Sequence, residues 1–343
     1  MGDSNVRISV VVIGYNVEKY IEKCLDSIID QIEENDEVIF VNDGSTDNTL
    51  GVLESYKNDS LIVVDKTNGG IISARKAGLA ISKGEFIIFV DGDDYVNPNM
   101  ITNFIRFVNG KEKVYDIIVS DHWEERPNGK IIKRTSTHVY GEISGDNYLR
   151  SILDGSLNHF LVNKLFKRSF IINAGYLRFP DITFAEDLFA NTIFGMHYPN
   201  VFYADMTNYY YQFNENSASR TDSFRIVDQH IEFIRKLTRI VRSNCDGKYD
   251  MYLLFQWYLF AYGYIQTNYS HEFKKYMMNK CGSRVKACYW SYLAKQQPRS
   301  LSKIYGRASL FVYLYLPLVS RLFNYCVRML VMFLHRLNLL KKY

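Results

Sequence analysis

The feature that most constrains this 343-residue chain is the regular alternation of short apolar runs and helical patterns over its first hundred residues. Four runs rich in β-branched and aromatic residues predict buried strands. These runs are residues 7–13, 37–41, 61–64 and 86–90. Apolar spacing predicts helices over 17–31 and 70–82, and Asp47 is placed to cap a helix that ends at Tyr56. The alternation predicts a Rossmann-like α/β fold, with a mostly parallel sheet and helices on both faces.

A polar loop follows each of the four predicted strands. The loops are residues 14–16, 42–47, 65–70 and 91–94. In open parallel sheets, ligands bind outside the carboxyl ends of the strands. We therefore expect these four loops to line a ligand site along one edge of the sheet.

The strongest local signal is the run Asp91-Gly92-Asp93-Asp94, directly after a predicted buried strand. Asp91 and Asp93 are separated by one residue and can reach the same ligand. Mg²⁺ and Mn²⁺ prefer oxygen ligands and often bind one or two carboxylates together with substrate phosphates. A solvated acidic turn is the alternative for such a short motif taken alone. The preceding strand and the three other polar loops favour a metal–diphosphate site.

Composition excludes several classes of protein. Hydrophobic residues make up 47% and charged residues 23% of the chain, which is the balance of a folded protein. The five cysteines are irregularly spaced and form no CxxC pair, so neither a disulfide framework nor a zinc site is expected. The apolar run 10–13 is too short for the core of a signal peptide, so we expect a cytoplasmic protein.

Ordered motifs of this chain resemble those of the family 2 glycosyltransferases with the GT-A fold. The family patterns P-x-[YF]-N, V-D-D-G-S-T-D, N-x-G-x-x-x-A-R-N, G-E-Y-I-x-F-x-D-x-D-D, K-L-[YF]-x-R and E-D resemble residues 13–16, 41–47, 68–76, 84–94, 164–168 and 186–187. The resemblance covers about residues 7–220 and is closest to bacterial transferases that build surface polysaccharides. It implies a nucleotide-sugar-binding half over 1–110 and an acceptor-binding half over 111–225. Residues 226–343 would form a helical C-terminal region.

Four positions depart from the family patterns. Ile13 replaces proline in the first turn, and Asn42 replaces the first acid of the second motif. Lys76 stands where the family carries asparagine and adds a charge near the expected donor site. Gln212 stands where a basic residue often follows the Y-x-Y pattern, which weakens any role of this position in binding a diphosphate.

The resemblance implies a UDP-sugar donor and gives individual residues roles in binding it. Asp43 would accept a hydrogen bond from the uracil N–H, Tyr15 would lie against the base, and Arg75 would reach the base or a phosphate. The other expected donor-binding residues are Ile13, Asn16, Asn68, Gly70, Asp91, Gly92, Asp94 and Arg220. Ordinary packing is the alternative for Tyr15, and Asn16 has the alternative of shaping a turn. Gly44 and Gly70 are expected at positive φ or at close backbone approaches.

The resemblance also implies a divalent metal cofactor, Mn²⁺ or Mg²⁺. Asp93 would hold this ion, with Asp91 beside it and on the ribose side of the nucleotide. Asp94 would orient the donor sugar or the loop.

An inverting reaction follows from the resemblance, and displacement by an acceptor hydroxyl is assisted by a carboxylate that takes its proton. Asp187 is the predicted base, since it occupies the second position of the E-D element, and Glu186 is the second choice. The alternative for Asp187 is to cap a helix over 188–197. The metal, Arg75 and Arg220 would stabilise the leaving diphosphate.

Two further segments carry open alternatives. Residues 208–220 are polar and aromatic and form either a lid over the donor or a surface connection. The basic cluster 164–168 either meets an anionic acceptor or is a solvated face. From Ile226 onward the pattern is helical.

The last 71 residues hold 14 Lys or Arg and no Asp or Glu, whereas residues 1–272 hold 27 basic and 37 acidic residues. The tail, 300–343, combines a wide apolar face with basic positions, as helices in a membrane interface do. We expect it to bind an anionic membrane surface, which makes the protein peripheral on the inner face of the cell membrane. Packing on the chain's own core or in a homodimer is the alternative. No nucleic-acid partner is expected, because the tail is too apolar.

The predicted function is inverting, metal-assisted transfer of a sugar from a UDP-sugar to a hydroxyl of a lipid-linked or oligosaccharide acceptor. A nucleotidyltransferase is one alternative, but such enzymes usually carry a basic, Gly-rich loop after the first strand, and residues 14–18 contain no Lys or Arg. A non-catalytic subunit that binds nucleotide sugars is the other alternative.

Overall fold

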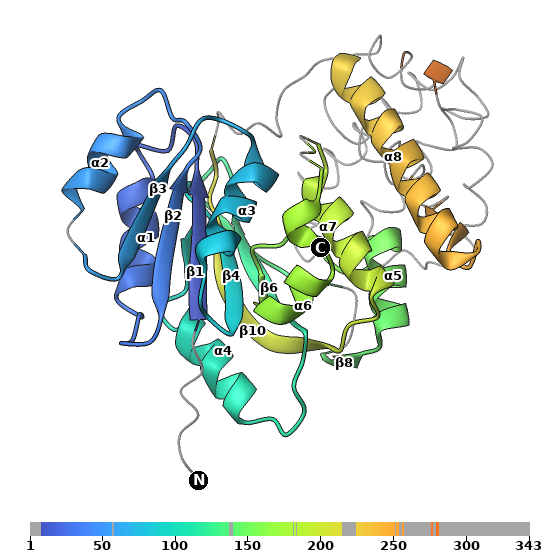
Figure 1. Ribbon diagram of the computed structural model, residues 1–343, viewed down its shortest axis with the longest axis horizontal. Coiled ribbons are helices and arrows are strands. Elements are labelled where there is room, and N and C mark those ends of the chain that lie inside the picture. The colour runs from blue at the N-terminus through green and yellow to red at the C-terminus, as the bar shows by residue number, and fades with distance from the viewer. Residues whose placement is uncertain are drawn as a thin grey trace, which may run out of the picture. The chain divides into compact units, whose positions relative to one another are not determined.

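The fold is described from a computed structural model (Figure 1). It describes residues 8–56, 58–136, 140–180, 182, 184–214, 224–250, 252, 253, 256, 276, 279 and 280. The chain divides into two compact units, Met1–Arg220 and Thr221–Tyr343. Arg220 and the basic tail over 300–343 lie outside the described residues, so their predicted roles stay predictions.

The first part of unit 1 alternates strands and helices. Its elements are β1 (Ile8–Gly14), α1 (Ile21–Ile29), β2 (Glu37–Asn42), α2 (Thr49–Ser55), β3 (Leu61–Asp65), α3 (Ile71–Ile81) and β4 (Phe86–Asp91). The four strands are parallel and lie in the order β3-β2-β1-β4. Each predicted strand and helix of this part is present within a few residues of its expected ends. The α/β fold is therefore confirmed.

The second part of unit 1 extends the same sheet in mixed orientation. Its elements are β5 (Tyr95–Val96), α4 (Met100–Asn109), β6 (Ile117–Glu125), β7 (Ile131–Arg134), β8 (Gly141–Ile143), α5 (Gly145–Asp154), β9 (Lys164–Lys167), α6 (Arg168–Asn173), the 3₁₀ helix η1 (Tyr176–Arg178), α7 (Glu186–Met196) and β10 (Val201–Tyr211). The sheet continues as β9-β6-β10-β5. Strand β9 is antiparallel to both β4 and β6, whereas β10 is parallel to β6. Both predicted halves of residues 1–225 therefore contribute strands to one sheet.

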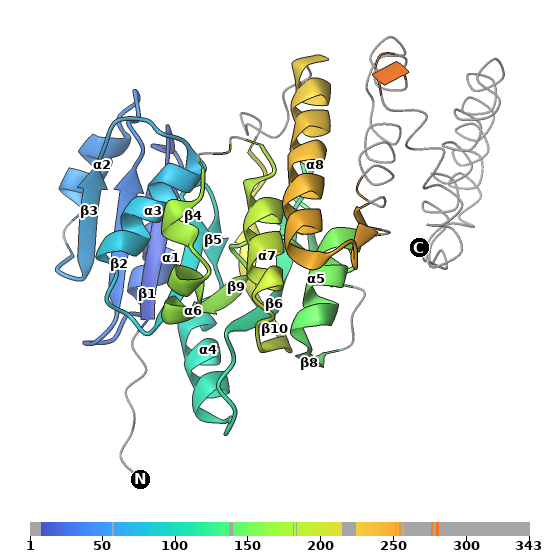
Figure 2. The same cartoon turned by 45° about the vertical axis from the view of Figure 1, so that its right-hand side comes forward.

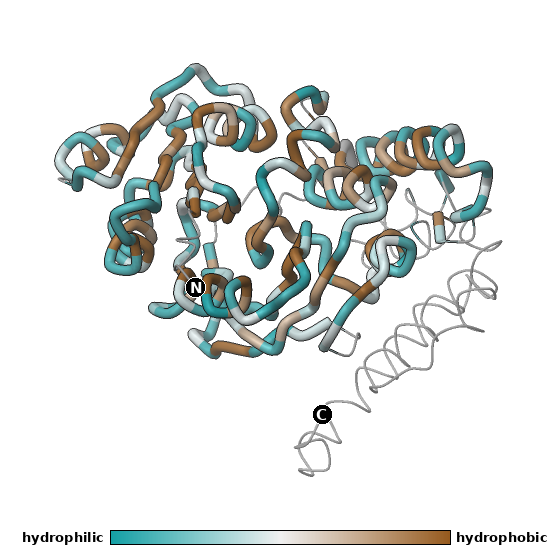
Figure 3. Tube along the Cα trace, turned by 60° about the horizontal axis from the view of Figure 1, so that its bottom comes forward, coloured by the Kyte–Doolittle hydropathy of each residue, from teal (hydrophilic) through white to brown (hydrophobic). Residues whose placement is uncertain are grey.

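Helices cover both faces of this sheet. Successive side chains of a strand point to opposite faces, and every residue of β1 is buried, so both of its faces are covered. Val10 and Val12 of β1 belong to the core that includes apolar residues of α1, α2 and α4. Val11 points the other way and lies so close to Gly78 of α3 that a Cβ there would be 2.3 Å from its Cγ1. Glycine at position 78 therefore lets α3 approach the sheet closely. Figure 2 shows helices flanking the strands, and Figure 3 shows mainly hydrophilic colour along the loops.

Unit 2 is described chiefly by helix α8 (Phe224–Cys245). The predicted helical pattern from Ile226 is confirmed there. Its buried side chains include Val227, Ile231, Ile234, Leu237 and Val241, spaced three or four residues apart. This spacing gives one apolar face, and α8 alternates brown and teal in Figure 3.

No helix among the described residues combines the length and the apolar character needed to cross a membrane.

Both alternatives for 208–220, a lid or a surface connection, are wrong for its first four residues. Residues 208–211 belong to β10, where Tyr209 and Tyr210 pair with Val96 and Tyr95 of β5. The aromatic residues there are strand residues because they pair across the sheet, which a polar-loop interpretation of the sequence overlooks. Residues 215–220 lie outside the described part of the chain.

Candidate functional site

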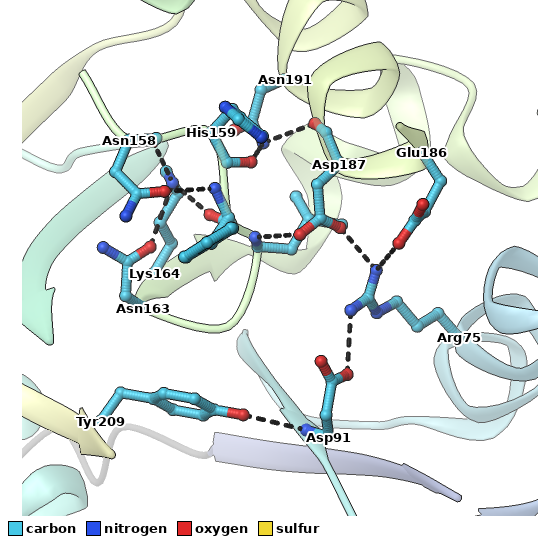
Figure 4. Close-up of polar contacts among 12 residues, drawn as sticks. Arg75, Asp91, Asn158, His159, Asn163, Lys164, Glu186, Asp187, Asn191 and Tyr209 are labelled. Atoms are coloured by element: carbon cyan, nitrogen blue, oxygen red, sulfur yellow. Dashed lines mark hydrogen bonds and ion pairs between the residues drawn. The ribbon is translucent and has the colours of Figure 1, made fainter. Parts of the chain in front are cut away.

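A buried guanidinium joins three carboxylates from distant parts of the chain (Figure 4). Arg75 of α3 is 1% exposed, and its Nη2 donates to Asp91 Oδ1 at 3.0 Å, at the end of β4. Its Nη1 donates to Asp187 Oδ1 at 2.7 Å and lies 3.9 Å from Glu186 Oε1. We call these four residues the Arg75 cluster. The structure thus brings Asp187 and Glu186, the two candidate general bases, next to Asp91.

Helix α7 presents both acids of this cluster from its first turn. The helix begins after Ala185, which has a φ of 55° and makes no side-chain cap bond. Acidic side chains in a first turn are favoured by the helix dipole. The Asp187 carboxylate does not bond its own helix, because it accepts from Arg75 and from the Leu161 backbone N–H at 3.2 Å. The alternative that Asp187 serves as a helix cap is therefore not what the structure shows.

The charges of the Arg75 cluster shift its pKa values. Burial raises the pKa of Asp91 to about 6, and the negative charge of Asp187 adds to the effect while Arg75 opposes it. Burial raises the pKa of Glu186 to about 7, and Asp187 again adds to it. Burial disfavours the charged form of Arg75, but Asp187 and Asp91 hold its pKa well above the ordinary value. The guanidinium is therefore cationic at neutral pH and compensates the carboxylates around it.

The other acids of the Asp91–Asp94 loop are bound by β10 and the residues that follow it. Asp94 is buried, and it accepts from the Tyr209 hydroxyl at 2.5 Å and from the Gln212 backbone N–H at 2.8 Å. The Tyr209 hydroxyl also accepts from the Asp91 N–H at 3.2 Å. Burial raises the pKa of Asp94 well above its usual range, with Asp93 adding to it. Asp94 therefore ties the loop to β10.

Asp91 and Asp93 fit a divalent cation that arrives with a diphosphate. Asn214 donates to Asp93 Oδ2 at 2.9 Å, and Arg75 takes Asp91 Oδ1. Each carboxylate keeps one oxygen that accepts no hydrogen bond from the described residues. The described part of the chain offers no group of three or more His, Cys, Asp or Glu that could hold a metal ion alone. Two carboxylate oxygens suit Mg²⁺ or Mn²⁺ when phosphates complete the coordination.

Asp43 organises the loop after β3. Its carboxylate accepts from Lys66 Nζ at 2.5 Å, from Gly69 N–H at 3.0 Å and from Gly70 N–H at 2.7 Å. A carboxylate offers about four acceptor sites, so one remains for a donor such as a uracil N–H. Gly44 and Gly70 have φ of 70° and 84°, which confirms the predicted positive φ at both.

The first turn is tied to the second. Asn16 has a φ of 56°, and its Oδ1 accepts from the Thr46 N–H at 2.7 Å, so the alternative that Asn16 shapes a turn is confirmed. Tyr15 is 50% exposed, which contradicts ordinary packing and leaves its ring accessible to a ligand. Ile13 and Gly92 contact each other through the backbone, where Gly92 N–H donates to Ile13 O at 2.8 Å.

Two residues that depart from the family pattern have protein partners. Asn42 Nδ2 donates to Asp65 Oδ1 at 2.7 Å, an interaction that an ionised aspartate at position 42 could not make. Lys76 Nζ donates to the carbonyl oxygen of Phe179 at 3.0 Å. The extra charge of Lys76 is thus directed to the chain itself. Asn68 is exposed at the edge of the loop that Asp43 organises.

The basic cluster 164–168 is neither a solvated face nor an acceptor-facing patch at its first position. Lys164 is fully buried, and its Nζ donates to carbonyl oxygens of the chain. Its amino group lies against the segment 158–160, where the carbonyl oxygens of Asn158 and Phe160 accept from it. Arg168 is also engaged, since its Nε donates to Ser82 Oγ at 3.1 Å.

The sequence did not indicate that Tyr209 binds Asp94 or that Asn214 binds Asp93. It also did not indicate that Lys164 is buried. The aromatic run Asn208–Phe213 marked the region but not its contacts. The predicted cap Asp47 lies one residue before the N-cap of α2, which is Asn48, and its Oδ1 accepts from the Thr49 N–H at 3.0 Å.

Comparisons with known proteins agree with this geometry. The sequence model described as Glycosyl transferase family 2 matches residues 9–172. EpsH of Bacillus subtilis (strain 168) is 31% identical over 218 residues, which are 61% of this chain and 62% of EpsH. The uncharacterized glycosyltransferase EpsJ of the same organism is 30% identical over 236 residues, 66% of either chain. The matched part of the chain thus spans just under two thirds of these relatives.

The fold agrees with a solved structure. The crystal structure of S. aureus TarS 1-349 in complex with UDP-GlcNAc superposes with a TM-score of 0.66 at 23% identity, covering 89% of this chain and 86% of that one. At 23% identity this similarity concerns the fold alone. The sheet of this chain has the order β3-β2-β1-β4, followed by the mixed extension. Residues 9–172 therefore form a glycosyl transferase family 2 domain, and the fold is the GT-A fold.

Proposed function

We propose that this protein transfers a sugar from a UDP-sugar to a hydroxyl group of a glycan acceptor in the synthesis of a surface polysaccharide, with inversion at the anomeric carbon. The observation that carries the proposal is the Arg75 cluster, in which one buried cation links Asp91 at the donor edge to Asp187. The family 2 domain over residues 9–172 supports the class of reaction. The TarS structure with UDP-GlcNAc supports a uridine diphosphate donor.

Asp187 is the proposed general base. Arg75 and the Leu161 N–H hold both oxygens of its carboxylate, so its orientation is fixed, and each oxygen retains a lone pair for an acceptor proton. Glu186 is the second choice on a specific observation, because a pKa of about 7 suits proton transfer near neutral pH. The substitutions Asp187→Asn and Glu186→Gln distinguish the two. Loss of transfer in Glu186→Gln with full transfer in Asp187→Asn would assign the base to Glu186.

The donor would lie over the loops that follow β1 to β4. The exposed ring of Tyr15 suits stacking on the base, and the remaining acceptor site of Asp43 suits the uracil N–H. Asp91 and Asp93 would hold a divalent cation, whose chemistry is to neutralise the charge that develops on the departing diphosphate. Arg75 adds a fixed positive charge close to Asp91 for the same purpose.

A screen of nucleotide sugars for UDP release tests this function. We expect release from at least one UDP-sugar with Mn²⁺ or Mg²⁺, and loss of about 100-fold or more in Asp93→Ala. Asp59→Ala is the matched control, because exposed Asp59 precedes β3 at the opposite edge of the sheet, and its activity should equal that of the wild type. Unchanged release in Asp93→Ala would remove the metal assignment.

The same screen separates the rival functions. A nucleotidyltransferase would release inorganic diphosphate from a nucleoside triphosphate and not UDP from a UDP-sugar. A non-catalytic binding subunit would bind UDP without releasing it from any UDP-sugar, with or without acceptor. Inversion is read from the anomeric configuration of the product by NMR, and retained configuration would contradict it.

The acceptor and the membrane contact rest on the sequence. A lipid-linked acceptor would suit a protein whose last 71 residues carry 14 basic and no acidic side chains. We expect deletion of 300–343 to move the protein from the membrane to the soluble fraction of a cell lysate. Unchanged fractionation would contradict the membrane contact and leave packing on the core or in a homodimer.

A further inference from the structure

Lys164 is a fully buried lysine whose amino group donates to three oxygen atoms of the described residues. Its Nζ donates to the carbonyl oxygen of Asn158 at 2.9 Å, to that of Phe160, and to Asn163 Oδ1 at 3.2 Å. Three acceptors match the three N–H donors of an ammonium group. No carboxylate lies within salt-bridge distance of Lys164 in the described part of the chain. The amino group is therefore used to bind the backbone of the segment 158–160.

That segment leads directly to the proposed base. The N–H of Leu161, the next residue, donates to Asp187 Oδ2 at 3.2 Å. The carbonyl oxygen of His159 accepts from Asn191 Nδ2 at 2.6 Å, and the same amide donates to the Asp187 carbonyl oxygen at 2.8 Å. Figure 4 shows Lys164 on one side of this segment and Asp187 on the other. The segment 158–161 is thus held by Lys164 on one side and by helix α7 on the other.

We propose that Lys164 is a positioning residue for Asp187: it fixes segment 158–161 so that the Leu161 N–H directs the carboxylate of the base. This inference rests on the proposed function, because it assigns Lys164 a place in that reaction. Burial lowers the pKa of Lys164 to about 7, and the charge of Asp187 acts in the opposite direction, so the two groups also interact electrostatically. The ammonium form donates all three hydrogen bonds, and the neutral amine can donate two of them.

Alternative uses of Lys164 fit the geometry less well. A residue 0% exposed cannot meet an acceptor glycan, and its Nζ has no donor position left for a phosphate. If Lys164 had a purely structural role, its substitution would destabilise the fold as a whole and would have no specific effect on Asp187. The two roles are separated by measuring Lys164 variants with and without the carboxylate of Asp187.

The test is a double-mutant cycle between Lys164→Met and Asp187→Asn, read as UDP release with acceptor present. We expect Lys164→Met to lower kcat about 10- to 100-fold in the wild-type background, with the KM for the donor changed less than about threefold. In the Asp187→Asn background the same change should lower the residual kcat less than about twofold. Thr192→Val is the matched control, since Thr192 is equally buried on α7 but bonds only the Leu188 carbonyl oxygen. Its effect should be equal in both backgrounds.

Equal losses of kcat for Lys164→Met in the two backgrounds would overturn the proposal, as would an unchanged kcat. If Lys164→Met does not fold, Lys164→Gln carries the same cycle, because its amide keeps at most two of the three N–H donors. Hydrogen exchange of the folded variant supplies a readout that does not depend on turnover. We expect the amide of Leu161 to exchange at least about tenfold faster than in the wild type. Unchanged exchange would also overturn the proposal, whereas absence of UDP release in the wild type would overturn only the proposed function.

Discussion

The contacts that join the loops of the parallel part span shorter stretches of chain than the contact that joins this part to the mixed part. In the parallel part, the loops are joined to one another over short stretches of chain. Asn16 bonds Thr46, 30 residues away, and Asp43 bonds Gly70, 27 residues away. Between the two parts, the bond from Arg75 on α3 to Asp187 on α7 spans 112 residues.

This difference teaches that the proposed donor edge is built locally, whereas the proposed reacting centre is closed by packing. The loops after β1, β2 and β3 can form once their strands pair. The Arg75 cluster exists only when α7 is packed in place, and the Asp91–Asp94 loop is bound only when β10 has joined the sheet. Substitutions in the local part should therefore change donor affinity, and substitutions at the long-range contacts should change stability and turnover together.

The largest effect is expected for Arg75→Met. Removal of the buried cation leaves Asp91 and Asp187 without their shared partner, which should lower the free energy of unfolding by about 3–5 kcal/mol. Turnover should fall below detection. Urea unfolding and UDP release measure the two effects, and Arg75→Lys, which keeps the charge but not the fork, should lie between wild type and Arg75→Met. Wild-type stability of Arg75→Met would show that the two parts are not joined through this residue.

A smaller effect is expected for Tyr209→Phe, which removes the hydroxyl between Asp94 and the Asp91 N–H. A buried carboxylate and a backbone donor each lose a partner, so the free energy of unfolding should fall by about 1–3 kcal/mol. The KM for the donor should rise, because the Asp91–Asp94 loop is less constrained. Tyr210→Phe is the control, since it keeps the ring that stacks on Tyr95, with 4.6 Å between the ring centroids. Equal losses in both variants would contradict the role of the Tyr209 hydroxyl.

The pH dependence of stability sharpens the account of the Arg75 cluster. Burial raises the pKa of Glu186 from 4.5 to about 7 in the folded protein, so the folded state binds more protons than the unfolded state between these values. The contribution of Glu186 to stability therefore falls as the pH rises through this window. Glu186→Gln should be more stable than wild type at pH 8, by about 1–2 kcal/mol, and the difference should vanish near pH 4. A constant difference across this range would refute the assigned cause.

The smallest effect on turnover is expected for Asp43→Asn in the local part. The variant keeps the shape of the side chain but loses acceptor strength toward Lys66, Gly69 and Gly70. The KM for the UDP-sugar should rise about three- to tenfold, with kcat within about twofold of the wild type. Donor titration at saturating acceptor gives both constants. A fall of kcat at constant KM would place Asp43 in the reacting centre instead of the donor edge.

The parallel part could be predicted from sequence because its signals are local. β-branched runs of four to seven residues and the loops after them located β1 to β4, and positive φ at Gly44 and Gly70 was expected. Asp91 was predicted from the acidic run after a buried strand, and Glu186 and Asp187 from the motif resemblance, without any sign that Arg75 links them. The spacing of residues 91 and 187 carries no information on their separation in space, because that depends on how α7 packs.

The mixed part could be predicted only coarsely. The sequence shows Lys164 as one charge in a basic cluster, whereas in the structure its amino group is buried against the carbonyl oxygens of segment 158–160. Residues 208–211 read as the start of a lid, yet their aromatic side chains pair with β5. Neither contact leaves a periodic pattern in a single segment.

The most direct test of the central claim compares UDP binding and sugar transfer in Asp187→Asn. Calorimetry with UDP and Mn²⁺ measures binding, and product formation from the UDP-sugar found in the screen measures transfer. The account predicts UDP affinity within about threefold of the wild type and transfer reduced about 100-fold or more, because the variant loses the base but keeps the donor edge. Wild-type transfer by Asp187→Asn would contradict the account.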